Sequence, residues 1–138
     1  MKKLILTMVC AVASTMLAGD ADEAAQARAR YQAKQQFMRQ KLGCSQGVVE
    51  GLVLERFDLI TTNAAIIRSM DLTNTFLMLK NPLYLRNITN FQAKVDDLAT
   101  AAAEKDLDKA AAAYSEVVSS CVACHKQFRR DQFRNGQK

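Results

Sequence analysis

Apolar residues recur along much of this chain at the spacing of α-helices. From about Asp22 to Val49 they fall at steps of seven, four and seven residues, which places Tyr31, Met38, Leu42 and Val49 on one face of a 3.6-residue period. Beyond Asp22 the chain has a single proline, and glycine occurs only at positions 43, 47, 51 and 136. No alternating β-branched run bounded by turn residues is present, so strands are not expected. Gly43 and Gly47 are expected to weaken the second half of this first helix.

Three more helices are expected downstream. They run from Phe57 or Asp58 to Met70, from Asn81-Pro82 to about Glu104, and from about Asp106 through Phe128. Asn81 can cap the third of these helices, and Pro82 suits its first turn. Short connections favour antiparallel neighbours, so the predicted fold is all-α, an antiparallel four-helix bundle.

The first twenty residues have the layout of a secretory signal peptide. Lys2 and Lys3 precede the apolar run "LILTMVCAVASTMLA", and cleavage is expected between Ala18 and Ala21. At about fifteen residues the run is short for a membrane span, although a retained anchor is the alternative. We therefore expect residues 1–20 to be removed, and residues 21–138 to be a single periplasmic domain that does not span the membrane.

The stretch Cys121-Val-Ala-Cys124-His125 contains the only histidine of the chain. A redox dithiol, half of a zinc site and covalent haem c attachment all use the C-x-x-C spacing. Zinc needs further ligands and no second histidine exists, while a thioredoxin-like dithiol follows a strand. On a helix the three side chains share one face, so two thiols can bind a porphyrin while the imidazole reaches its iron. One covalent haem c, near the C-terminal end of the last helix, is therefore predicted.

The segment "KDLDKAAAAYSEVVSSCVACHKQFRR" resembles the last helix of the class II c-type cytochromes, the cytochrome c′ family. Upstream, Gly51 and Phe57-Asp58 resemble that family's break after its first helix. The resemblance implies thioether bonds at Cys121 and Cys124, His125 as proximal iron ligand, and Arg129 either in contact with a haem propionate or as a solvated charge.

The resemblance leaves the sixth iron position open. Some family members block it with an apolar side chain, whereas a low-spin branch uses a methionine of the first helix, for which Met38 is the candidate. Counted back from Gly51, the family's distal position falls nearer Gln35 or Gln36. Gln32 also stands where the family has an arginine.

The expected function is electron transfer by a periplasmic monohaem cytochrome with His125 and Met38 as iron ligands. The alternative is a five-coordinate haem protein that binds nitric oxide or carbon monoxide. An enzyme is not expected, because no distal histidine with arginine is available. The formal charge of +5, of which two lysines leave with the signal peptide, is too mild for nucleic acid.

The expected partners are redox proteins. The basic residues that follow the C-x-x-C-H would favour an acidic one: Lys126, Arg129, Arg130, Arg134 and Lys138. Cys44 is expected to be an inert apolar residue; if exposed, it could join two copies as a homodimer.

Overall fold

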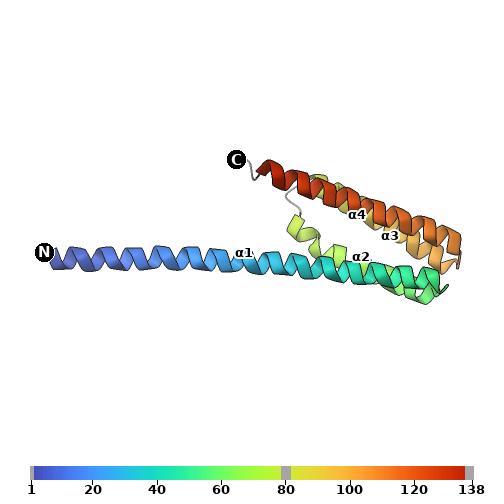
Figure 1. Cartoon of the computed structure of the whole chain (residues 1–138), viewed down its shortest axis with the longest axis horizontal. Coiled ribbons are helices and arrows are strands. Elements are labelled where there is room, and N and C mark those ends of the chain that lie inside the picture. Colours follow the sequence, from blue (N-terminus) through green and yellow to red (C-terminus); the bar gives the residue numbers. More distant parts are fainter. Residues whose placement is uncertain (1, 79–81, 136–138) are drawn as a thin grey trace. The chain divides into compact units, whose positions relative to one another are not determined.

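A computed structural model describes the backbone of residues 2–78 and 82–135, and the side chains of residues 21–70 and 82–134. The described part is all-α, with four helices and no strand: α1 Lys2–Val53, α2 Phe57–Met78, α3 Pro82–Ala103 and α4 Leu107–Asn135 (Figure 1). The predicted all-α four-helix fold is confirmed. The chain divides into two compact units, one ending at Gln40 and one beginning at Lys41, which are described separately.

Two predicted helix boundaries are wrong. The first helix begins at Lys2 rather than near Asp22, and the second ends at Met78 rather than at Met70. No proline or glycine lies between Met70 and Pro82, so nothing in the chain terminates the second helix where its apolar pattern fades. The third helix begins at Pro82 as predicted, and Asn81 lies outside the described residues.

In the unit from Lys41 onward, the helices are joined in two hairpins whose turns share one geometry. Glu55 and Lys105 adopt positive φ values of 53° and 58° directly after α1 and α3. Beyond them, the amides of Arg56 and Asp106 donate back to the carbonyls of Gly51 and Ala101, at 2.8 and 3.1 Å. This pattern satisfies the last carbonyls of each helix and reverses the chain.

The core of this unit is built from α2, α3, α4 and the end of α1. Its buried apolar residues are Val48, Ile60, Ala64, Ile67, Phe91, Val95, Leu98, Ala101, Ala102, Ala110 and Val117. α2 packs on α3, and α3 packs on α4; the last two lie side by side in Figure 1. Removing these side chains from water is the main favourable term that holds the helices together.

Small residues let α1 approach α2 closely. A Cβ atom on Gly47 would lie 2.5 Å from Asn63 Nδ2, and one on Gly51 would lie 2.7 Å from Ile60 Cγ1. By contrast, a Cβ atom on Gly43 would have no neighbouring atom within 4 Å. None of the three glycines interrupts α1, so the expected weakening at Gly43 and Gly47 does not appear as a break in the helix.

The predicted inward face of the first helix is wrong in the part that belongs to this unit. Leu42 and Val49 are 59% and 43% exposed, whereas Val48 is fully buried and Cys44 packs against the core. The face that contacts α2 carries small side chains, so a pattern of large apolar residues pointed to the wrong side. Tyr31 and Met38 belong to the other unit, where both are exposed.

Candidate functional site

The predicted haem-binding residues lie in the second half of α4, beyond its last buried residue. Val117 is 2% exposed, and no described side chain of α4 after it is buried. Cys121 and His125 are exposed and Cys124 is half-buried. Spacings of three and four residues place all three on one side of the helix, where a planar group could reach both thiols and the imidazole.

The helix that carries these residues is well anchored at its start. Asp106 caps α4, since its Oδ1 accepts a hydrogen bond from the Lys109 amide at 3.0 Å, and this contact lowers the pKa of the carboxyl group. About two turns further, the Tyr114 hydroxyl donates to the Ser45 carbonyl of α1 at 3.1 Å and lies 2.6 Å from the Ser45 hydroxyl. The first half of α4 is therefore fixed to α1 and to the core.

Apolar side chains flank the three residues without being covered by the protein. Val118, Val122 and Phe128 of α4 are 42%, 47% and 38% exposed. Exposed apolar side chains that gather on one face can mark a binding surface. A porphyrin ring bonded to Cys121 and Cys124 is an apolar disc of the kind that such residues can cover, so the residues present fit the group.

At the far end of the site, α3 contacts α4 through one tyrosine. The ring of Tyr84, in the first turn of α3, meets that of Phe128 edge-on, with the centroids 6.4 Å apart. Its hydroxyl donates to Asp131 Oδ2 at 3.3 Å, while Asp131 Oδ1 accepts from Gln127 Nε2 at 2.9 Å. Burial, more than the nearby Asp131 charge, raises the pKa of Tyr84.

The basic residues near the site are exposed. Lys126, Arg129, Arg130 and Arg134 all face solvent, and Arg130 donates to Gln127 Oε1 at 3.0 Å. Their positions on a 3.6-residue period fall within less than half a turn of α4, so they form one basic face. Lys138 lies outside the described residues.

Two further predicted residues are described separately from this site. Met38 belongs to the unit that ends at Gln40, so its role as an iron ligand stays a prediction. Cys44 is half-buried and packs against the core, as expected of an inert apolar residue. Sequence reasoning missed Tyr84 and Asp131, because neither belongs to the C-x-x-C-H motif or to an apolar stripe.

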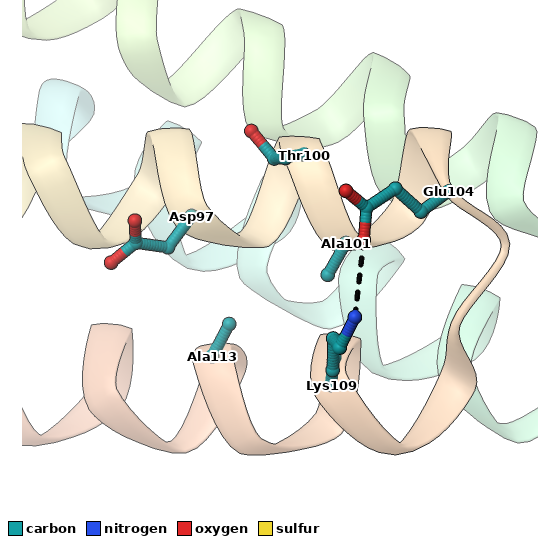
Figure 2. Close-up of a pocket in the computed structure, with 6 residues that line it drawn as sticks. All are labelled: Asp97, Thr100, Ala101, Glu104, Lys109 and Ala113. Carbon is teal, nitrogen blue, oxygen red and sulfur yellow. Dashed lines mark hydrogen bonds and ion pairs between the residues drawn. The ribbon is translucent and has the colours of Figure 1, made fainter.

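A hollow lies between α3 and α4, at the end of the hairpin remote from His125. It has a volume of about 250 Å³ and is lined by Asp97, Thr100, Ala101, Glu104, Lys109 and Ala113. In Figure 2 the Lys109 ammonium reaches Glu104, at 3.3 Å. The charged groups are exposed and already paired, so this hollow offers no preformed ligand site.

The described residues contain neither a cluster of metal-binding side chains nor a helix able to span a membrane. Within them, no group of three or more histidine, cysteine, aspartate or glutamate side chains could hold a metal ion. A haem does not need such convergence, because its ring spans the distance from the thioether sulfurs to the iron. No helix in the described part of the chain is long and apolar enough to cross a membrane.

The α3–α4 hairpin carries its C-x-x-C-H face in an all-α fold, the arrangement expected of a c-type haem protein. A family model described as Cytochrome C' matches residues 81–129, which include Cys121, Cys124, His125 and Arg129. The match confirms the resemblance to the cytochrome c′ family over these residues. No curated protein and no solved structure matches the chain.

Proposed function

We propose that this protein is an exported monohaem cytochrome that transfers electrons, with His125 and Met38 as the two axial iron ligands. The observation that carries the proposal is the C-x-x-C-H face of α4, which lies within the residues matched by the cytochrome c′ family model. Bound haem would supply the one-electron couple of its iron. The protein's own residues would attach the ring, ligate the metal and cover the apolar surface.

Each residue of the face has a separate part in this proposal. Cys121 and Cys124 would hold the ring through thioether bonds, and His125 would bind the iron. The exposed side chains of Val118 and Phe128 would cover apolar parts of the ring. Arg129, exposed one turn after His125, would pair with a propionate.

We favour electron transfer over gas binding because a methionine is proposed as the distal iron ligand. A methionine thioether completes a low-spin iron shell and raises the reduction potential, whereas an empty position binds nitric oxide or carbon monoxide. Met38 is available on the first helix, and the single histidine of the chain is already used. Catalytic turnover is not part of the proposal, because the sequence has no second histidine to act as a distal base.

The basic face of α4 supports a partner of opposite charge. Lys126, Arg129, Arg130 and Arg134 would accelerate encounter with an acidic redox protein, and salt would slow that encounter. Export to the periplasm rests on the N-terminal sequence pattern, and pairing of two copies stays a prediction.

Optical spectra of the purified holoprotein test the distal ligand. Methionine ligation predicts low-spin spectra in both redox states and slow, weak binding of carbon monoxide. Met38→Ala should convert the iron to a high-spin form that binds carbon monoxide readily, while Met70→Ala should leave the spectrum unchanged. High-spin spectra in the unaltered protein would reject Met38 and support the gas-binding alternative.

A further inference from the structure

In the end of α4 that carries the haem-binding residues, the described side chains are exposed or half-buried. Its last buried residue is Val117, one turn before Cys121. Cys121, His125 and Phe128 are exposed. A helix end with few buried contacts opens locally at low free-energy cost. An iron ligand on such an end needs a fixed orientation, because small displacements alter metal coordination.

Tyr84 supplies two contacts to this helix end. Its ring packs edge-on against Phe128, and its hydroxyl donates to Asp131, one and two turns beyond Cys124. Both oxygens of the Asp131 carboxylate are used, since Gln127 donates to the second at 2.9 Å and Arg130 in turn donates to Gln127. Three residues of the last turns of α4 are thus connected to a single residue of α3.

We propose that Tyr84 and Asp131 are positioning residues for the haem: they orient the turns of α4 that follow His125, and the Asp131 carboxylate supplies a negative charge six residues beyond it. The inference rests on the proposed covalent haem. The ring contact fixes how α4 lies against α3. The hydrogen bond offsets part of the carboxylate charge on the same helix as the iron ligand.

This role predicts opposite electrostatic effects from two small changes. A negative charge near the iron stabilises the ferric state and lowers the reduction potential. Asp131→Asn removes the charge and should raise the potential. Tyr84→Phe keeps the ring but removes the donor, which leaves the carboxylate charge less compensated and should lower the potential. If the two residues had a purely structural role, the two variants would not shift the reduction potential in opposite directions.

The matched control is Tyr114→Phe. Tyr114 is also a half-buried tyrosine whose hydroxyl forms a hydrogen bond to a neighbouring helix, at Ser45 of α1. It lies on α4 before the haem-binding residues, so its loss should not affect them directly. Loss of one hydrogen bond speeds local opening about five-fold. In Tyr84→Phe, amide hydrogen exchange of residues 127–131 should rise by about that factor, whereas in Tyr114→Phe it should stay unchanged there.

The experiment measures haem content by mass, exchange by mass spectrometry and potential by redox titration in all four proteins. Opposite shifts of potential in Asp131→Asn and Tyr84→Phe, with faster exchange in Tyr84→Phe alone, support the inference. If both variants shift the reduction potential in the same direction, or if amide exchange of residues 127–131 is equal in the Tyr84 and Tyr114 variants, the inference is wrong. The haem assignment would still stand. A protein without haem refutes the proposed function, and the exchange comparison then still decides whether Tyr84 holds the helix end.

Discussion

The three glycines of α1 allow the packing of α1 on α2 to be measured by one substitution and its control. Gly43→Ala adds a methyl group where no atom lies within 4 Å. Its only expected effect is the better helix propensity of alanine, which stabilises the fold by about 1 kcal/mol. Gly51→Ala gains at most the same amount, but adds its methyl group in a crowded place.

The crowding at Gly51 involves atoms that cannot move independently. The added carbon would lie 2.7 Å from Ile60 Cγ1, 3.0 Å from the Arg56 carbonyl oxygen and 3.1 Å from the Ile60 amide nitrogen. Ile60 is fully buried, and the Arg56 oxygen accepts hydrogen bonds from the first turn of α2. Overpacking of this kind costs about 1–3 kcal/mol. Gly51→Ala should therefore be about 1–3 kcal/mol less stable than Gly43→Ala.

Urea unfolding of the holoprotein, followed by circular dichroism at 222 nm or a similar helix signal, measures this difference as a change in the midpoint urea concentration. The slope of the unfolding free energy against urea, about 1–3 kcal/mol/M, should stay constant. The comparison between the two variants cancels the propensity gain and leaves the packing term. If Gly51→Ala proves as stable as Gly43→Ala, α1 and α2 do not approach each other as described, and the explanation of the small-residue face fails.

Three further predictions concern the α3–α4 hairpin. Lys105→Gly should raise the free energy of unfolding by about 1 kcal/mol, because Lys105 holds a φ of 58°; a lower thermal midpoint would contradict this. Leu98→Ala should cost about 2–5 kcal/mol, because Leu98 is fully buried; a smaller loss in urea unfolding would mean that the core is open there. The lowered pKa of Asp106 contributes stability above its unfolded value of 3.8, which is lost as pH falls through the folded pKa. Acid titration of unfolding should thus show a smaller loss in Asp106→Asn, and identical curves would refute the cap.

The helical periodicity was enough to predict the fold class, because each segment contains strong helix formers and few breakers. The prediction failed where the burial of a residue depends on the approach of a neighbouring helix. Val48 is buried and Val49 exposed because the close approach of α2 at Gly47 and Gly51 selects the face, and that approach is not encoded in the spacing of large apolar residues. The end of α2 was missed for a related reason, since a fading apolar pattern does not terminate a helix.

The candidate haem-binding residues could be proposed from the sequence because the chemistry they suggest is local. Cys121, Cys124 and His125 lie within five positions, so helix geometry alone brings them together. Tyr84 and Asp131 are 47 residues apart and meet only because α3 and α4 pack antiparallel. No spacing rule links such a pair. Met38 shows the same limit, since its distance from His125 along the chain makes its role a question of packing.

The central claim is that one haem is covalently bound through Cys121 and Cys124. The mass of the protein purified from cells able to mature c-type cytochromes, measured after unfolding in acid, tests it directly. The account predicts the mature polypeptide plus one haem, and failure of stable attachment when both cysteines are replaced by alanine. A mature polypeptide of unmodified mass under those conditions would contradict it.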